Sequence, residues 1–144
     1  MNLNIDRWAA QTAQKITQGT NDAKKLFSLL NKALGVLQSQ GVYACMLYLY
    51  AENDQKNASV VRKALWGLLE RLEKEAKVEW PNGFELPKNV DLGAKEFRTQ
   101  QQVLQFYSDA IAADLDTLLL VRDLYEQTLI YARYHAKALG GEEK

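Results

Sequence analysis

The sequence predicts an all-α protein, a single-domain helical bundle of five to six helices with a central apolar helix. Only two prolines and eight glycines occur in 144 residues, and most lie between segments whose apolar residues recur at helical spacing. The apolar content of 47% is enough for a chain of this length to bury a core. The segment over 42–51 is apolar throughout, which marks the central helix.

The first two helices are predicted from one-sided apolar stripes. The first stripe consists of Ile5, Trp8, Ala9 and Ile16, and the helix should end near Gly19. Thr20 or Asn21 can cap the second helix, because short polar side chains accept hydrogen bonds from free backbone N–H groups. The apolar stripe of the second helix runs over 23–37, and Gly41 interrupts the pattern.

The third helix follows Gly41 and has no polar face before Glu52. A helix that is apolar on all sides must be covered on all sides, so we expect it at the centre of the bundle. It is about half as long as a membrane span, which needs about 20 apolar residues. The fourth helix should start at Asn57 or Ser59 and turn its leucines inward.

The segment over about 78–93 contains both prolines and an Asn-Gly step, which predicts a loop. Helical patterning then continues from Ala94 to Leu139, either as one very long helix or as two with a bend near 107–110. Two opposed apolar stripes in this region predict burial on both sides, against the core or against a partner. The candidate subunit-interface residues are Phe106, Leu120, Arg122, Leu124 and Tyr131.

Arg122 interrupts the first of these stripes with a charge. A charge at such a position needs an acidic partner, either Glu126 one turn on or an acid from a neighbouring helix or subunit. We therefore interpret Arg122 as a residue that acts in assembly.

The net charge is zero, with eighteen basic and eighteen acidic residues, which argues against indiscriminate nucleic-acid binding. The two halves differ, because residues 1–77 are the more basic and residues 78–144 the more acidic. This asymmetry is typical of a subunit that stacks, or of one that faces phosphate on one side. The alternative is that an asymmetry of this size arises by chance.

The residue types argue against catalysis, a cofactor or a metal site. His135 falls in a last helical turn, where a cation satisfies free carbonyls, and Cys45 lies in an apolar helix where its thiol should ionise poorly. Asp109, Asp116 and Asp123 repeat every seven residues, about 10 Å apart, which is typical of a solvated face. We expect no enzymatic activity; a small enzyme built on these acids is the weaker alternative.

Two surface features are candidates for RNA binding. The polar face of the second helix carries lysines and no acid, a pattern that can track a phosphate backbone, although ordinary solvated faces also look like this. In the fourth helix a tryptophan lies near two cations and can stack on a base, or it packs under the loop over 78–93. The candidate RNA-binding residues are Lys24, Lys25, Lys32, Arg62, Lys63 and Trp66.

The order of these segments resembles the small helical subunit of the type III-B CRISPR effector, the Cmr RNA-silencing complex. The resemblance spans about 23–139: the leucine-rich AKKLFSLLNKALGVLQSQ, then Gly41 and an apolar helix, then QFYSDAIAADLDTLLLVRDLYEQTL. In this family a Gly-Leu pair is typical where the chain has Gly41-Val42, and the loop over 78–93 is longer than the family needs. A type III-A small subunit is therefore an alternative.

The resemblance implies a non-catalytic subunit that stacks along an RNA-guided filament in antiviral defence, with other Cmr-type subunits, guide RNA and target RNA as partners. Self-stacking in the complex is compatible with a monomer when the protein is alone. A helical protein-interaction adaptor without nucleic acid is a further alternative, and the neutral net charge favours it. The chain start lacks a signal-peptide pattern, and one cysteine fits a reducing compartment, so a cytoplasmic location without membrane contact is expected.

Overall fold

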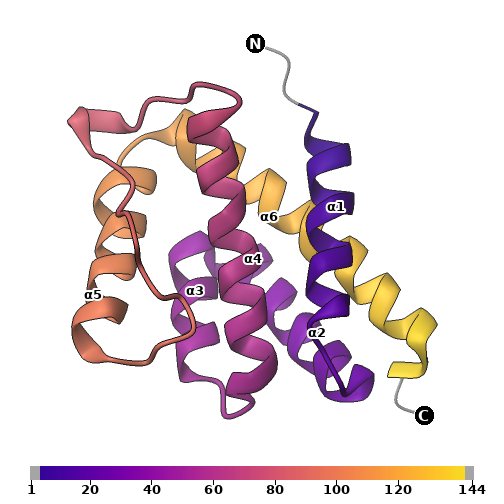
Figure 1. The fold of residues 1–144 in the computed structure, drawn as a ribbon. Coiled ribbons are helices and arrows are strands. Elements are labelled where there is room, and N and C mark those ends of the chain that lie inside the picture. The colour runs from indigo at the N-terminus through magenta and orange to yellow at the C-terminus, as the bar shows by residue number, and fades with distance from the viewer. Residues whose placement is uncertain (1–3, 142–144) are drawn as a thin grey trace.

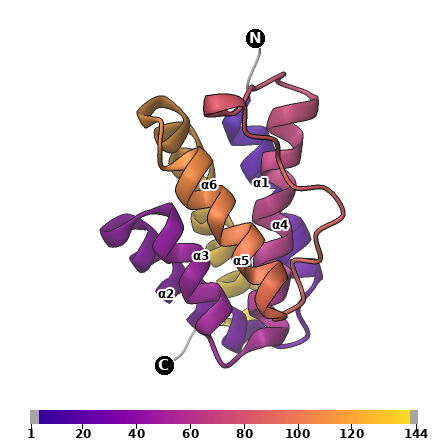
Figure 2. The ribbon, with the colours of Figure 1, turned by 90° about the vertical axis from the view of Figure 1, so that its left-hand side faces the viewer.

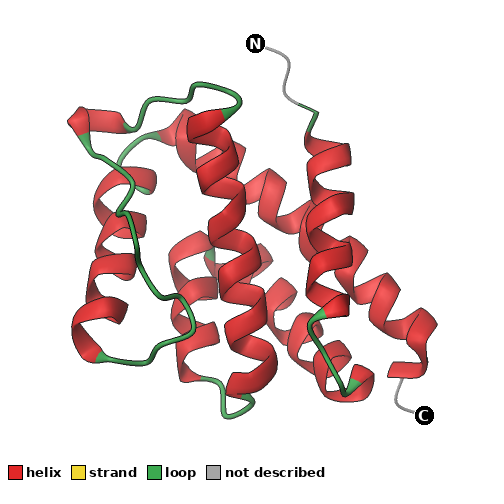
Figure 3. Ribbon diagram, in the orientation of Figure 1, coloured by secondary structure: helices red, strands yellow, loops and turns green. Residues whose placement is uncertain are grey.

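A computed structural model describes residues 4–141, and within this range the chain forms helices and no strand (Figure 1, Figure 3). The α-helices are α1 Ile5–Gln18, α2 Ala23–Gln40, α3 Val42–Ala51, α4 Gln55–Lys74, α5 Phe97–Phe106 and α6 Leu115–Ala136. Shorter helical turns are η1 Pro81–Gly83, η2 Tyr107–Ile111 and η3 Lys137–Gly141. The predicted all-α bundle is confirmed.

Short polar side chains start four of the helices by accepting a hydrogen bond from a backbone N–H three residues on: Asn4, Asp22, Asp54 and Asp114. The predicted caps Thr20 or Asn21 and Asn57 or Ser59 are therefore wrong. The Thr20 hydroxyl instead donates to Asn57 Oδ1 at 2.7 Å, which joins the turn before α2 to the first turn of α4.

Gly41 separates α2 from α3, as predicted. Its φ of 101° is a conformation that side chains with a Cβ rarely adopt, so glycine is required at this break. Its N–H donates to the carbonyls of Leu37 and Val36, which closes the end of α2.

The prediction that α3 is covered on all sides is wrong, because one strip of the helix is exposed. Cys45, Met46 and Leu49 are fully buried, but Tyr43 is 41% exposed and Leu47 is 43% exposed. Helices α2, α4, α5 and α6 contact α3 and leave this strip open. Figure 2, which faces α5, shows α3 beside it.

Within residues 4–141, no helix combines the length and the apolarity that crossing a membrane requires.

The hydrophobic core draws buried side chains from all six α-helices. Helix α6 packs against both α1 and α2, and it passes behind α1 and α4 in Figure 1. Tyr125 and Leu129 of one apolar stripe and Leu124 of the opposite stripe are buried, so both stripes meet the core. The tip of α6 differs, because Leu115 and Leu119 are exposed.

The predicted bend between the last helices is confirmed, and it is a π-helical turn. In η2 the Ala112 N–H donates to the Tyr107 carbonyl five residues earlier, at 2.9 Å. The helical conformation ends after η2, and α6 begins at Leu115 with Asp114 as its N-terminal cap. The helix before the bend starts at Phe97, later than the predicted Ala94.

The loop between α4 and α5 covers residues 75–96, a few residues more at each end than predicted. Glu73 holds it from α4, because its carboxylate accepts from Trp80 Nε1 at 2.8 Å and from Lys88 Nζ at 2.6 Å. These bonds keep the Glu73 pKa below its usual range. The loop therefore lies across the core as a fixed cover.

Candidate nucleic-acid interface

Four lysines line one surface groove of about 690 Å³ beside the turn between α3 and α4. Lys24, Lys25 and Lys32 come from α2, and Lys56 comes from the first turn of α4. The remaining lining residues are Ser28, Leu29, Glu52, Asn53, Asp54 and Gln55. We call this surface the lysine groove. Three of the six predicted RNA-binding residues therefore lie together.

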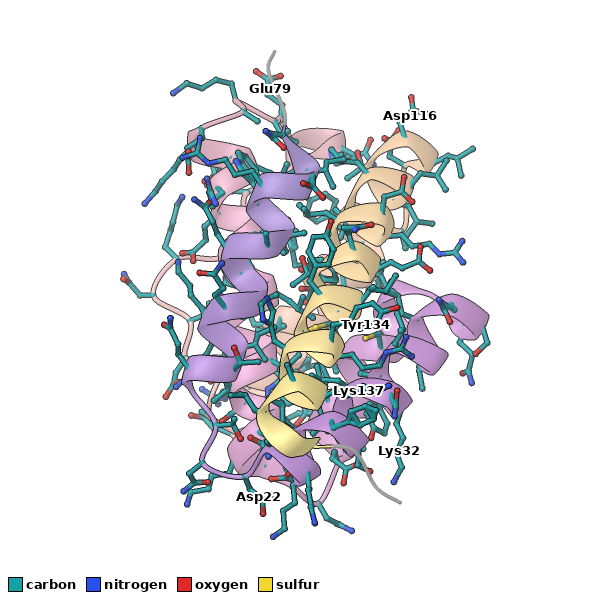
Figure 4. The ribbon with its side chains drawn as sticks, turned by 90° about the vertical axis from the view of Figure 1, so that its right-hand side faces the viewer. Asp22, Lys32, Glu79, Asp116, Tyr134 and Lys137 are labelled. Atoms are coloured by element: carbon teal, nitrogen blue, oxygen red, sulfur yellow. The ribbon has the colours of Figure 1, made fainter. Side chains whose placement is uncertain are left out.

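Helix geometry brings the α2 lysines to one face, because residues three or four positions apart are neighbours. Ser28 lies between Lys24 or Lys25 and Lys32 at this spacing, and the buried Leu26 and Leu30 hold the opposite side of α2 against the core. In Figure 4 Lys32 lies toward the end of the molecule opposite Asp116, which belongs to the acidic half of the chain. The basic groove and the tip of α6 are thus separated in space.

Two carboxylates, Glu52 and Asp54, line the lysine groove, and both accept hydrogen bonds from residues close to them in the chain. Glu52 accepts from the Tyr48 hydroxyl at 2.5 Å and from the Asn53 N–H at 2.9 Å. These bonds, with the charge of Lys32 nearby, lower the Glu52 pKa. Asp54 caps α4 through the Asn57 N–H. Across residues 4–141, the salt bridges at 4.0 Å or less involve none of the groove lysines.

The prediction that Arg62 contacts RNA is wrong, because its side chain is fully buried. The guanidinium donates to the carbonyl oxygens of Leu92 and Leu49 and to Gln55 Oε1, each within 2.9 Å. It also lies 4.3 Å from the centroid of the Tyr50 ring. Burial lowers the Arg62 pKa. Arg62 therefore joins the 75–96 loop to the turn that carries part of the lysine groove.

Trp66 is also buried, at 3% exposure, so the predicted exposed stacking residue is wrong. Its ring meets those of Phe106 and Tyr107 edge to face, and Pro87 and Leu92 of the loop lie beside it. The alternative that it packs under the loop is confirmed.

Lys63 is exposed but lies outside the lysine groove. Its side chain lies against the loop at Gly93, because a Cβ added to Gly93 would come within 2.9 Å of Lys63 Cε. It lines instead a groove between α1 and α4 with Lys15, Arg71 and Lys74.

Two of the five candidate interface residues are core residues. Phe106 is 4% exposed and Leu124 is fully buried, so neither can form a subunit contact in this fold. Leu120 and Tyr131 are half-buried and pack against the core, and the Tyr131 hydroxyl donates to Asp6. For Phe106 and Leu124 the alternative of burial in the core is confirmed, and for Leu124 the cause is the packing of α1 and α2 against α6. An interface role of Leu120 and Tyr131 stays a prediction.

Arg122 does not pair with Glu126. Its Nη2 donates to the Gln38 carbonyl at 3.1 Å, in the last turn of α2 where carbonyls lack helical partners. Glu126 accepts instead from the Gln38 side chain at 3.0 Å. Glu126 is therefore not the partner of Arg122, which is a half-buried link from α6 to α2. An acid of another subunit stays a prediction.

The residues considered for catalysis have ordinary surroundings. Burial raises the pKa of the Cys45 thiol to about 12, as expected for a protonated thiol in a core, and its S–H points to the Ala33 carbonyl. Asp109, Asp116 and Asp123 are exposed. In the described part of the chain no three His, Cys, Asp or Glu side chains come together to hold a metal ion.

Sequence reasoning missed Lys56 and Glu52 of the lysine groove. Both lie beyond α2 in the chain, and only the packing of α2 beside the α3–α4 turn brings them to the lysines. The hydrophilic run over 52–57 was the available signal.

No family model, curated protein or solved structure matches this chain.

Proposed function

We propose that the protein is a non-catalytic small subunit of a type III-B CRISPR (Cmr) effector complex in the cytoplasm. In this complex it stacks along the filament beside other Cmr-type subunits and contacts the backbone of guide and target RNA. The lysine groove is the observation that carries the proposal, and the order of sequence segments suggests the class of complex.

The groove favours phosphate over base contacts. Lysine ammonium groups are compact charges that bind phosphate without selecting sequence. The groove's lining residues include no aromatic side chain on which a base could stack. A protein that holds a guide–target duplex needs this kind of contact, because base pairing supplies the sequence specificity.

Isolation of the complex tests the assignment directly. Tagged protein purified from its own cells at low salt should carry short RNAs that share a repeat-derived end, together with larger Cmr-type subunits. Type III-A subunits in their place would indicate the related complex. Clean protein with a different partner and no RNA would overturn the proposal.

Replacement of Lys24, Lys25, Lys32 and Lys56 together by glutamine should weaken binding of single-stranded RNA about tenfold or more at low salt. The slope of log affinity against log salt concentration should shrink by about 0.7 for each phosphate that is no longer neutralised. Fluorescence anisotropy of a labelled oligonucleotide across a salt series measures both quantities.

The matched control replaces Lys15, Lys63, Lys74 and Lys77 by glutamine, which changes the net charge equally on other surfaces. If both variants lose affinity alike, the lysine groove is not the binding surface. If neither loses affinity, RNA binding through these surfaces is excluded.

Glu52→Gln should strengthen RNA binding about two- to fivefold at low salt, because it removes a negative charge from the groove. Glu79→Gln is the control, since Glu79 lies at the far end of the molecule from Lys32 (Figure 4). The same anisotropy titration applies. Weaker binding by the Glu52 variant would show that its carboxylate orders the groove instead of opposing phosphate.

The second candidate function is a helical adaptor that binds protein and no nucleic acid. A net charge of zero and the exposed Leu115 and Leu119 at the tip of α6 favour it. In that case both lysine variants would leave RNA association unchanged at a background level.

A further inference from the structure

A second groove, of about 350 Å³, lies between α3 and α5 and has a different chemistry from the lysine groove. Its lining residues are Tyr43, Phe97, Gln100, Gln101, Leu104, Gln105 and Ser108. None of them is charged. We call this surface the glutamine groove.

Two aromatic rings of this groove are open to solvent. Phe97, the first residue of α5, is 74% exposed, and Tyr43 on the uncovered strip of α3 is 41% exposed. Large apolar side chains at such exposure gain little from the protein's own core. Aromatic faces in this position are what unpaired nucleobases stack on, and stacking tolerates every base because each has a π face.

Three amide side chains stand beside these rings. In the described residues no hydrogen bond is formed by the side chains of Gln100, Gln101 or Gln105. A glutamine amide offers two donors and one acceptor group, which can match the hydrogen-bonding edge of a base. Ser108 is already satisfied, since its hydroxyl donates to the Gln105 carbonyl.

The three amides favour a nucleobase over an apolar helix of a protein partner as the ligand of this groove. Burying three unpaired amides under apolar side chains would leave their polar atoms without hydrogen bonds, which is unfavourable. A base can cover the aromatic rings and pair with the amides at once. An uncharged groove is also complementary to a neutral base, while a phosphate or an acidic peptide would find no cation in its lining.

The position of the groove is compatible with one RNA strand reaching both surfaces. Tyr43 lies in the first turn of α3, and Glu52 of the lysine groove directly follows its last residue. A ten-residue helix is about 15 Å long, at 1.5 Å per residue. Lys95 and Arg98 flank Phe97 in the chain and are exposed, with the acid Glu96 between them.

We propose that the glutamine groove binds an unpaired nucleobase of RNA, with its face against Tyr43 or Phe97 and its edge toward the glutamines. This inference rests on the proposed function, because the base belongs to an RNA whose backbone the lysine groove holds. It adds a contact that is independent of salt and that the lysines cannot provide.

The test compares two octamers that carry the same number of phosphates: an ordinary single-stranded oligoribonucleotide and its abasic counterpart. The parent protein should bind the ordinary octamer about tenfold more tightly. The Tyr43→Leu, Phe97→Leu double variant keeps apolar bulk and removes the aromatic faces, so this difference should disappear while the salt slope stays unchanged. Leu47→Ala with Phe84→Ala, exposed apolar residues outside the groove, should keep the difference.

Equal affinity of the parent protein for both octamers would overturn the base site and leave the proposed function standing, provided that the lysine variant still weakens both. Absence of any octamer binding would overturn both. A double variant that keeps its RNA affinity but loses a protein partner or self-association would show that the groove docks protein instead. Thermal unfolding of each variant confirms that binding is measured on folded protein.

Discussion

Trp66→Ala is expected to lower the free energy of unfolding by about 3–5 kcal/mol, the usual cost of removing a buried tryptophan ring. Its ring centroid lies 5.8 Å from those of both Phe106 and Tyr107, so the truncation leaves a cavity where α4, α5 and the loop meet. Chemical denaturation followed by far-ultraviolet circular dichroism measures the change.

Tyr134→Ala is the control for this variant, because Tyr134 is 61% exposed and its truncation should change the free energy by about 0.5 kcal/mol or less. RNA affinity should fall in the Trp66 variant only as far as folded protein is lost. A stable Trp66 variant with impaired RNA binding would contradict the buried position and support a role in base stacking.

Arg62→Ala is expected to lower the free energy of unfolding by about 3 kcal/mol. Hydrogen bonds from a charged donor contribute about 1.5–3 kcal/mol each, and the relief of burying a charge offsets part of their loss. The carbonyls of Leu92 and Leu49 lose their guanidinium donor. Gln55 Oε1 loses its bond to the guanidinium, while Gln55 Nε2 keeps its bonds to the Leu49 and Tyr50 carbonyls.

The same variant should loosen two segments that Arg62 joins. Limited proteolysis should cut faster within 75–96, and RNA affinity should fall moderately, because Gln55 belongs to the turn of the lysine groove. Arg62→Lys should restore little, since one ammonium cannot replace the planar guanidinium. Lys63→Ala, at the next position and exposed, is the control and should unfold like the parent. Unchanged proteolysis in the Arg62 variant would contradict this role.

Local patterns located the helices well where the chain itself carries the signal. Gly41 ends α2 because no other residue adopts its backbone conformation easily, and the bend predicted near 107–110 is the π-helical turn that starts at Tyr107. The caps were misplaced by a few residues because several neighbouring Thr, Asn, Ser and Asp side chains can all accept the same bond.

Half of the predicted RNA-binding set was correctly placed on one surface. Lys24, Lys25 and Lys32 share a helix, so their common face follows from helix spacing alone. Arg62 and Trp66 were misjudged because the 75–96 loop covers them, and nothing in the periodicity of α4 indicates where a distant loop lies. Lys56 joins the groove only through the packing of α4 beside α2.

The helical fold, the approximate bounds of most helices and the common face of the α2 lysines follow from the sequence, because they depend on interactions over a few residues. The open strip of α3, the buried Arg62 and the aromatic rings and amides that lie together between α3 and α5 appear only in the packed molecule. These depend on which distant segments pack together, and apolar periodicity shows that a face is buried without showing what covers it.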